Sequence, residues 1–352
     1  MVVEHNDLLQ KQLHSFKPPV LVVSTIAGKG IYSIGEALKE RFPKDWPVYH
    51  LPIEEMLPKN ALREDYDRYR FISNNLPWVL YLVYCIPFFY YRKLFREKYL
   101  HITDLSIIKE KIDTLKIKTV ICASHRPAFW LSNLKYQKGL NFYLCGALSE
   151  FGRNLGWKYI LWDVMDSYFS PVEKDELDFP FPRHMRFEKI ELPCQEKYYS
   201  LAAIPGERNT TLFVVGHWGQ VFVKKARIII RELLKCSPAL KVEVVCGRNN
   251  KLKEKLMIYF KGEQRVRIHG ELGSLAGLMQ ECGSIITKPG ISTLLETHVA
   301  GRQIFLLKGL PVAEDNNARY AIKNYGARWF TPQQFKEWHQ SLSAQGGVLR
   351  DN

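Results

Sequence analysis

The sequence lacks the signatures of several protein classes. It contains no C-x-x-C pair, and its seven cysteines are irregularly spaced, so neither a zinc finger nor a disulfide framework is indicated. No uninterrupted apolar run reaches the roughly 20 residues that a membrane-spanning helix needs. Residues 1–19 have no sustained apolar core, which argues against a signal peptide. These absences predict a cytoplasmic chain with reduced thiols and no metal site.

Acidic residues are scarce relative to basic ones. The chain has 50 Lys and Arg against 36 Asp and Glu, a net charge of +14. Such a balance favours acidic partners: nucleic acid, an anionic lipid surface or a phosphorylated small molecule. However, no zinc-finger spacing, RNP-type aromatic pattern or basic repeat accompanies the charge. We therefore predict no nucleic-acid partner.

The order of strand, glycine turn and helix begins twice, at residues 20 and 212. In the first case Val20–Thr25 is followed by Gly28-Lys29-Gly30, and in the second 212–215 is followed by 216–219. With 352 residues, two domains are more natural than one. Further strands are predicted at 48–51, 118–123, 158–162, 241–245, 266–269, 284–287 and 303–307. We expect an α/β protein with two Rossmann-like domains over 1–200 and 201–330, then a C-terminal helix and tail over 331–352.

The stretch 283–326 is the most informative part of the chain. A short apolar run ends at Lys288-Pro289-Gly290, a helix follows over 291–300, and Gly301 precedes the next apolar run. A strand that turns through glycine into a helix presents backbone N–H groups and a helix dipole to a phosphate. Ser292 and Thr293 add hydroxyl donors, and Glu296 is suitably spaced to accept from ribose hydroxyls. An ordinary βαβ turn with a capping hydroxyl fits the same pattern.

Two more sets of polar residues follow predicted strands. Ser124-His125-Arg126-Pro127 follows the strand at 118–123, and Asp163 and Asp166 follow the strand at 158–162. Ligands of open α/β sheets bind beyond the carboxyl ends of strands, so these are candidate catalytic positions. For His125 a purely structural role is an alternative.

Residues 71–91 carry no charge, and basic residues follow them directly. Aromatic side chains beside Arg and Lys suit the interface of an anionic membrane, while Pro77 and Pro87 argue against spanning it. The predicted acceptor and membrane residues are Trp78, Tyr81, Phe88, Phe89, Arg92, Lys93 and Arg96. The alternative is a helix pair buried under the first sheet or at a domain interface.

Several motifs in order resemble one family. Residues 212–226 (LFVVGHWGQVFVKKA), 242–256 (VEVVCGRNNKLKEKL) and 285–327 resemble the glycine-rich loop, the C-G-[RK]-N segment and the T-K-[AP]-G-x-x-T-x-x-E and P-x-x-E-x-x-N motifs of GT-B glycosyltransferases of family 28. That family includes monogalactosyldiacylglycerol synthases, processive diacylglycerol glucosyltransferases and, further off, the transferase that makes lipid II. The likeness is strong over 212–330 and weaker but collinear over 20–170.

The resemblance implies a GT-B architecture, two Rossmann-like domains facing an interdomain cleft. It also implies a UDP-sugar donor held by the second half, without metal or additional cofactor. The implied donor-binding residues are Gly216, His217, Gly219, Arg248, Lys288, Gly290, Ser292, Thr293, Glu296, Glu314 and Asn317. In this scheme Gly290, Ser292 and Thr293 face the diphosphate and Glu296 the ribose, while Glu314 and Asn317 lie near the sugar or the diphosphate.

The first half departs from the family. The histidine expected as base after the first glycine turn is replaced by Ile31, which cannot take a proton. An inverting transfer needs a base near the acceptor hydroxyl. Asp163 is the leading alternative, His125 the second and His217 the third.

The resulting expectation is an inverting hexosyltransferase that uses a UDP-sugar and a diacylglycerol-like lipid, bound peripherally to the cytoplasmic face of an anionic membrane. Two alternatives stay open. One is a transferase with a soluble small-molecule acceptor, and the other is a non-catalytic nucleotide-sugar-binding protein that lacks the histidine base.

Overall fold

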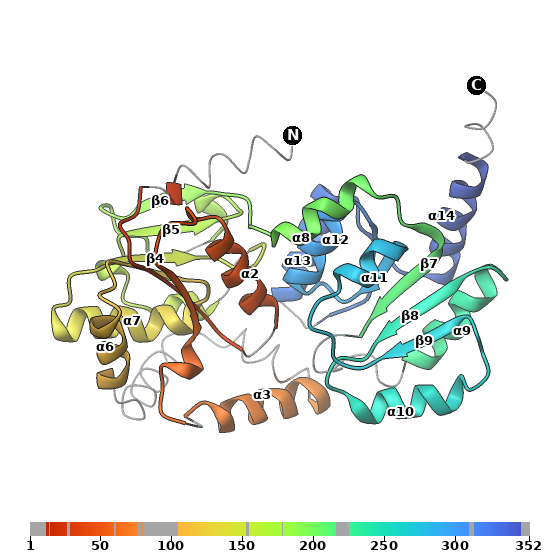
Figure 1. Cartoon of the computed structure of the whole chain (residues 1–352), viewed down its shortest axis with the longest axis horizontal. Helices are drawn as coiled ribbons and strands as arrows, with labels where there is room; N and C mark the ends of the chain where they lie inside the picture. Colours follow the sequence, from red (N-terminus) through yellow and green to blue (C-terminus); the bar gives the residue numbers. More distant parts are fainter. Residues whose placement is uncertain are drawn as a thin grey trace. The chain divides into compact units, whose positions relative to one another are not determined.

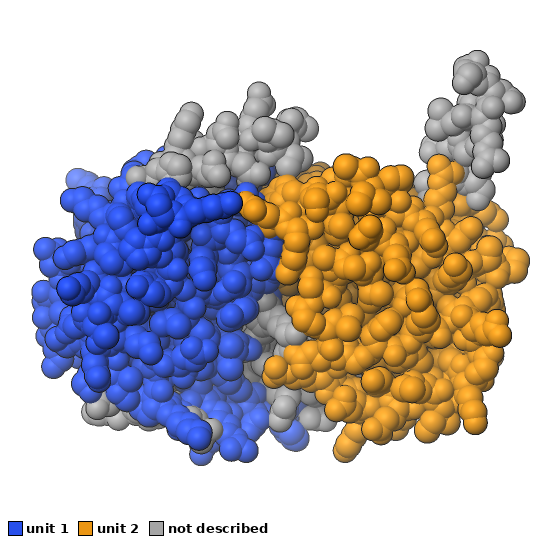
Figure 2. Space-filling view, in the orientation of Figure 1, with its two compact units in different colours: residues 1–195 blue, residues 196–352 orange. Residues whose placement is uncertain are grey.

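The computed structural model describes residues 12–13, 15–26, 29–59, 61–76, 79, 105–152, 155–177, 179–215, 225–309 and 313–345. The chain divides into two compact units, Met1–Gln195 and Glu196–Asn352, which Figure 2 shows in separate colours. Each unit is built around its own parallel sheet.

Unit 1 contains a six-stranded parallel sheet in the order β2-β1-β3-β4-β5-β6. Its strands are β1 (Val20–Ser24), β2 (Val48–Pro52), β3 (Thr119–Cys122), β4 (Tyr143–Ala147), β5 (Ser167–Ser170) and β6 (Arg186–Lys189). Strands β4, β5 and β6 are labelled in Figure 1. Every residue of β1 and β3 is buried, as expected for apolar, β-branched runs in a sheet covered on both faces. The strand order reverses between β1 and β3, because the chain places β2 on one side of β1 and β3 on the other.

The described helices of unit 1 are α2 (Lys29–Glu40), α3 (Arg63–Asn75), α6 (Leu105–Thr114) and α7 (His125–Lys138), with 3₁₀ turns η1 (Ile53–Glu55), η2 (Leu155–Tyr159), η3 (Trp162–Val164) and η4 (Lys174–Glu176). Helix α7 is the most enclosed of these, since residues 127–134 are all buried. It ends at Gly139, whose φ of 58° is a left-handed value that favours glycine.

Unit 2 contains a second six-stranded parallel sheet in the order β12-β11-β10-β7-β8-β9. Its strands are β7 (Glu207–Val214), β8 (Lys241–Val245), β9 (Val266–His269), β10 (Cys282–Thr287), β11 (Gln303–Leu306) and β12 (Arg328–Trp329). Its helices are α8 (Glu196–Tyr199), α9 (Ala226–Cys236), α10 (Asn250–Tyr259), α11 (Ala276–Glu281), α12 (Ile291–Val299), α13 (Ala313–Tyr325) and α14 (Pro332–Gln345), with the turn η5 (Ser200–Ala203).

Apolar clusters lie on both faces of the second sheet. The cluster with α9, α10 and α14 includes Phe213, Ile230, Leu256, Phe305 and Trp338. The cluster with α12 and α13 includes Leu294, Ile304, Leu306, Ala318 and Ala321. The final helix is therefore part of the core of unit 2. Gly301, with φ 68°, follows α12 and allows the chain to turn at once into β11, as the sequence predicts.

The strand predicted over 158–162 is wrong. The segment forms the 3₁₀ turns η2 and η3 instead, and the sheet positions are taken by β4, β5 and β6, which the sequence pattern did not predict. Aromatic packing explains the difference: the rings of Trp157 and Tyr168 meet edge to face at 4.9 Å, and Trp162 packs in the same way on Phe181 at 4.9 Å. A short apolar run can be buried in a helical turn as well as in a strand, so its pattern does not decide between them.

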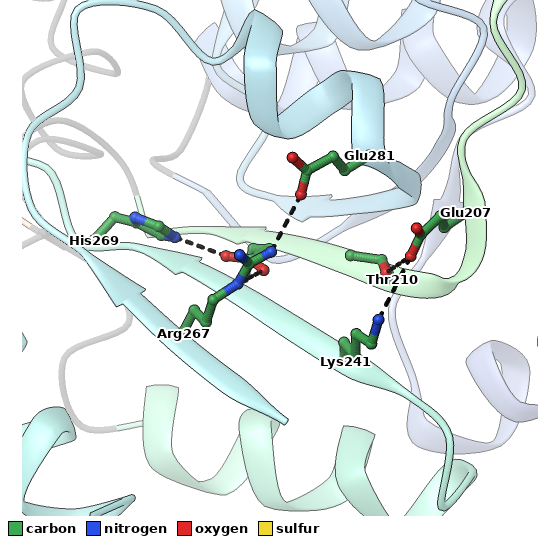
Figure 3. A network of polar contacts seen from close by, with 7 residues as sticks. Glu207, Thr210, Lys241, Arg267, His269 and Glu281 are labelled. Atoms are coloured by element: carbon green, nitrogen blue, oxygen red, sulfur yellow. Dashed lines mark hydrogen bonds and ion pairs between the residues drawn. The ribbon is translucent and has the colours of Figure 1, made fainter. Parts of the chain in front are cut away.

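A buried carboxylate ties the edge strand β9 to the second sheet (Figure 3). Glu243 of β8 is 1% exposed, and it pairs with Arg267 and, at 2.7 Å, with Nε2 of His269. Arg267 also reaches Glu281 at 3.2 Å. Because each buried charge in this network has a partner, we assign it a structural role.

None of the described helices combines the length and the apolar character needed to cross a membrane.

Candidate functional site

The strand order of unit 2 reverses between β7 and β10. The chain places β8 and β9 on one side of β7, and β10, β11 and β12 on the other. Val214 lies opposite Thr287 near the carboxyl ends of these parallel neighbours. The segments that follow β7 and β10 therefore start side by side, at the kind of position where open α/β sheets bind ligands.

The segment after β10 is a tight turn that opens helix α12. The N–H of Gly290 donates to the carbonyl of Lys288 at 2.7 Å, and Gly290 is the N-cap, with φ −76° and ψ 131°. Because glycine has no side chain, Gly290 cannot cap the helix with a side-chain hydrogen bond. The first-turn N–H groups of α12 have no intrahelical acceptor, and the helix dipole adds positive potential at the same place. The local structure is thus suited to an anion such as a phosphate.

An ion pair joins this turn to the next helix. Lys288 pairs with Glu314, near the start of α13, and the two side chains are only 20% and 11% exposed. Lys288 Nζ lies 3.9 Å from where a Cβ on Gly290 would stand, so the ammonium lies close to the N-terminus of α12. A cation is unfavourable at the positive end of a helix, and Glu314 provides the compensating negative charge.

Two further contacts fix the turn. The side-chain amide of Asn317, which is 2% exposed, donates to the carbonyl of Pro289 at 3.1 Å. A Cβ on Gly309 would lie 2.2 Å from Oε2 of Glu314 and 2.8 Å from Cδ of Pro289, so only glycine fits there without movement. Asn317 therefore anchors Pro289 through a hydrogen bond, and the absence of a side chain at Gly309 lets Pro289 and Glu314 pack closely there.

The other predicted residues of α12 lie where their spacing indicated. Ser292 and Thr293 are in the first turn and partly buried, and Glu296 follows one turn later and is 7% exposed. A carboxylate this buried needs polar partners within the fold. A contact from Glu296 to ribose stays a prediction.

Arg248 and Asn249 follow β8 at the same edge of the sheet. Gly247, with φ 58°, turns the chain there. Arg248 has an exposed side chain whose Nε donates to Glu271 at 3.0 and 3.1 Å. Asn249 caps α10 by accepting from the N–H of Leu252 at 3.0 Å. The asparagine of this motif thus has a structural role, and Arg248 remains a predicted nucleotide contact.

Some predicted residues fall outside the described part of the chain. They are the donor-loop residues Gly216, His217 and Gly219 and the acceptor and membrane residues Trp78, Tyr81, Phe88, Phe89, Arg92, Lys93 and Arg96.

In unit 1, His125 opens helix α7 beyond the carboxyl end of β3. Its ring packs against Gly156, where an added Cβ would lie 2.2 Å from ring carbon Cδ2. Burial, with a contribution from Arg126, lowers the pKa of His125 from 6.5 to about 3. The imidazole is therefore neutral but weakly basic, which is unfavourable for a general base working near neutral pH.

Asp163 lies elsewhere than expected, because the strand that should have placed it does not form. Residues 161–166 run alongside α7. The N–H of Leu161 donates to Ser132 Oγ at 3.3 Å, and Asp166 pairs with Lys135 at 2.5 Å. Asp166 also accepts at 2.7 Å from the N–H of Leu144, at the amino-terminal end of β4. Asp163 is exposed on η3, next to that amino-terminal end rather than beyond the carboxyl ends. Its role as a base stays a prediction without positional support.

Glu54, an acidic residue after the second strand, was not among the predicted site residues. Glu54, on η1 directly after β2, accepts from the N–H of Ile26 at 3.2 Å, from Thr25 Oγ1 at 2.5 Å and from the hydroxyl of Tyr66. Burial raises the pKa of Tyr66, which keeps its hydroxyl protonated as a donor. The guanidinium of Arg126 lies over the Tyr66 ring at 4.8 Å. The order of strand and then acid was visible in the sequence, but the contact with Ile26 was not.

A second set of polar contacts, formed by Ser24, His50 and Glu36, lies beside the contacts of Glu54. Nε2 of His50 lies 2.7 Å from Ser24 Oγ, and Nδ1 contacts the carboxylate of Glu36. A Cβ on Gly35 would lie 2.3 Å from His50 Nε2. The side chain of His50 and Ser24 are both fully buried, so neither group is open to a substrate. We therefore assign the contacts of Ser24, His50 and Glu36 a structural role in the packing of β1, β2 and α2.

Among the described residues, no group of three or more His, Cys, Asp and Glu side chains is arranged to hold a metal ion.

Comparison with known proteins supports the fold and the resemblance. No protein-family model matches the chain. It is 26% identical over 214 residues to a processive diacylglycerol beta-glucosyltransferase of Bacillus mycoides (strain KBAB4), which covers 57% of this chain and 53% of the relative. A protein of the same name from Bacillus cereus (strain G9842) is 22% identical over 331 residues, covering 88% and 81%. In the first of these matches the chain spans about half the length of its relative.

Two solved structures share the architecture. Os79 from O. sativa, solved with U2F and trichothecene, superposes with a TM-score of 0.54 at 13% identity, covering 90% of this chain and 89% of that one. MurG of Acinetobacter baumannii gives a TM-score of 0.51 at 12% identity, covering 92% and 90%. The chain therefore has the GT-B architecture with two Rossmann-like domains, and its predicted resemblance to the processive diacylglycerol glucosyltransferases is confirmed.

Proposed function

We propose that this chain is an inverting glycosyltransferase that moves a hexose from a UDP-sugar to a diacylglycerol-like lipid at the cytoplasmic face of a membrane. The observation that carries the proposal is the turn Lys288–Gly290 at the strand-order reversal of unit 2. It combines an uncapped helix N-terminus with a lysine held in place by Glu314. The likeness to diacylglycerol glucosyltransferases supports the choice of donor and acceptor.

The chemistry follows from the charges. The acceptor hydroxyl oxygen attacks the anomeric carbon, the bond from that carbon to the UDP oxygen breaks, and the hydroxyl proton passes to a base. Negative charge grows on the departing diphosphate, and pre-positioned donors stabilise it without reorganising. In our proposal the first-turn N–H groups of α12, the hydroxyls of Ser292 and Thr293 and the ammonium of Lys288 supply this stabilisation.

The remaining donor contacts in this proposal follow the roles that the resemblance implies. Glu314 lies next to Lys288, so its carboxylate is placed to accept from sugar hydroxyls once the diphosphate engages the lysine. Asn317 acts indirectly, by holding Pro289. Glu296 is assigned to ribose and Arg248 to the nucleotide.

The base is tested separately from donor binding. If Asp163 is the base, then Asp163→Asn should lower kcat at least about 100-fold and leave the affinity for UDP unchanged, because general bases contribute factors of this order. The matched control is Asp175→Asn, another exposed carboxylate on a 3₁₀ turn of unit 1. Equal kcat for Asp163→Asn and wild type would remove Asp163 from the mechanism.

The function itself is tested with the full chain. Purified protein is incubated with UDP-glucose or UDP-galactose and liposomes that contain diacylglycerol, and UDP release is measured. Turnover that requires both substrates supports the proposal. Hydrolysis without transfer, transfer only to a soluble acceptor, or no turnover with any common UDP-sugar contradicts it.

One observation favours a second function. Ile31 occupies a position in α2 where the family has its histidine, and His125 is a weak base. A nucleotide-sugar-binding protein without catalysis would combine these features with an intact Lys288–Gly290 turn. Normal UDP affinity without turnover, and a gain of turnover in Ile31→His, would indicate this function.

A further inference from the structure

Four large apolar side chains are exposed on two neighbouring helices of unit 2. On α10, Met257, Ile258 and Tyr259 are 52%, 77% and 41% exposed, and on α9, Ile228 is 55% exposed. A single exposed apolar residue needs no explanation, but a cluster on the outer surface of adjacent helices marks an interaction site.

Packing on the sheet does not account for these residues. The inner face of α10 is formed by Leu252 and Leu256, which are 2% and 3% exposed within the core cluster. Ile258 lies two positions after Leu256, and therefore on the opposite side of the helix. Ile258 thus belongs to an outer face that the folded chain leaves in contact with water. Met257 lies two positions before Tyr259 and therefore points to the other side of α10.

Tyr259 joins the two helices through basic side chains. The guanidinium of Arg227 lies over its ring at 4.3 Å, and Nη1 of Arg231 donates to its hydroxyl at 3.2 Å. Both arginines are on α9, next to or one turn from Ile228. Ile228, Ile258 and Tyr259 therefore lie on the side of the two helices where Arg227 and Arg231 contact Tyr259.

Further basic residues lie on the same side of α10. Lys251 and Lys255 precede Ile258 by seven and three positions, which places them along one helix face, and both are exposed. The acidic residues of the two helices are Glu254 on α10 and Glu232 on α9, and Glu232 pairs with Lys235 at 2.7 Å. Apolar side chains surrounded by Lys and Arg are the composition of a helix surface that lies in the interface of an anionic membrane.

We propose that this surface of unit 2, formed by Ile228, Ile258 and Tyr259 with Arg227, Arg231, Lys251 and Lys255, docks onto an anionic lipid bilayer. Charge complementarity identifies the occupant: the chain carries +14 overall, and the surface itself is basic. A second copy of the chain is disfavoured, because a two-fold contact would bring the same basic side chains together. The proposal concerns lipid binding alone and does not depend on transferase activity.

The experiment must report contact at this surface, because other parts of the chain can also bind lipid. Ile258→Cys in the full chain is labelled with an environment-sensitive fluorophore and mixed with vesicles of phosphatidylcholine, with or without phosphatidylglycerol. The matched control is Ile322→Cys, a residue 38% exposed on α13. We expect a blue shift at position 258 with the anionic vesicles, none with phosphatidylcholine alone, and none at position 322. Wild-type protein taken through the same labelling measures reaction at the native cysteines.

Sedimentation with the same vesicles gives the energetics. Ile258→Asn and Lys255→Glu should each lower the partition coefficient roughly fivefold, since an interfacial basic residue contributes about 1 kcal/mol and a partly buried isoleucine a similar amount. Ile322→Asn should change it less than about twofold, because substitutions outside the docking surface do not alter its contacts. Circular dichroism establishes that each variant is folded.

Three results would overturn the proposal. The first is a label at position 258 that does not respond to anionic vesicles. The second is wild-type partitioning of both surface variants. The third is self-association of the wild-type chain in the absence of lipid that is lost in Ile258→Asn, since that would identify a second copy as the occupant.

Discussion

Lys288 and Glu314, 26 residues apart in the sequence, form an ion pair beside the N-terminus of α12. The pair places a cation where the helix dipole alone would repel it, and Glu314 compensates the charge. In the proposed mechanism, an incoming diphosphate offers Lys288 a second anionic partner. The Lys288–Gly290 turn is organised by the ion pair within the chain itself.

The two members of the pair should affect UDP binding in opposite directions. Lys288→Met removes a charged donor to the diphosphate and should weaken UDP binding roughly tenfold or more, since such bonds are worth about 1.5–3 kcal/mol. Glu314→Gln removes a negative charge that competes for Lys288, so UDP should bind at least as tightly as to wild type. Isothermal titration calorimetry measures both affinities, and Asp315→Asn, on the next residue of α13, is the control. Equal losses in both variants would contradict the assigned roles.

Gly290 and Gly309 should differ in what they tolerate. A Cβ on Gly290 meets only Lys288 Nζ, at 3.9 Å, so Gly290→Ala should fold with nearly unchanged stability. If the diphosphate lies against this turn, the same methyl group should nevertheless weaken UDP binding. Gly309→Ala places its methyl 2.2 Å from Glu314 Oε2 and should be destabilised by roughly 1–3 kcal/mol through overpacking. Urea unfolding and calorimetry give the two readouts.

The control for this pair is Gly273→Ala, where an added Cβ meets nothing within 4 Å. It should retain both stability and UDP affinity. Unchanged UDP binding in Gly290→Ala would show that the ligand does not approach the turn closely.

Glu54 should contribute more to stability than its neighbour. Glu54→Gln replaces a charged acceptor of three groups with a neutral one that has a single acceptor oxygen, leaving part of the set Ile26 N–H, Thr25 Oγ1 and Tyr66 hydroxyl unsatisfied. We expect a loss of about 1–3 kcal/mol in the free energy of unfolding. Glu55→Gln, an exposed residue of the same turn, should change it by less than about 0.5 kcal/mol. Similar values for the two variants in urea unfolding would refute the assignment.

His125 should make unit 1 acid-sensitive. Its pKa is lowered by burial and by Arg126 from 6.5 to about 3. As the pH falls, the unfolded chain takes up this proton first, so the stability present above about pH 6.5 is lost progressively toward pH 3, at up to about 1.4 kcal/mol per pH unit. His125→Asn cannot titrate, and its difference from wild type should therefore shrink between about pH 6 and pH 4. Urea unfolding at each pH measures this difference, and a constant difference would contradict it.

Local pattern predicted the parts of the fold that depend on neighbours in the sequence. The order of β10, turn, α12 and β11 follows from a β-branched run, a glycine at the N-cap and Gly301 after the helix, and these signals act over a few residues. The resemblance of 285–327 to the family motifs rests on the same local spacing. The strands missed in unit 1 are no shorter than those predicted there. For β5, the packing of Trp157 on Tyr168 comes from a separate segment, and the periodicity of the strand itself does not show it.

The sequence by itself determined the α/β class, the two Rossmann-like halves and the position of the Lys288–Gly290 turn. Strand and helix periodicities and glycine positions are local properties. Only the tertiary structure decided which side chains meet there. Lys288 pairs with Glu314, and Asn317 donates to Pro289, because α13 returns to the start of α12 after β11. It likewise placed Glu54 against Ile26 and moved Asp163 away from the carboxyl edge, since such contacts depend on strand order and packing between segments distant in the sequence.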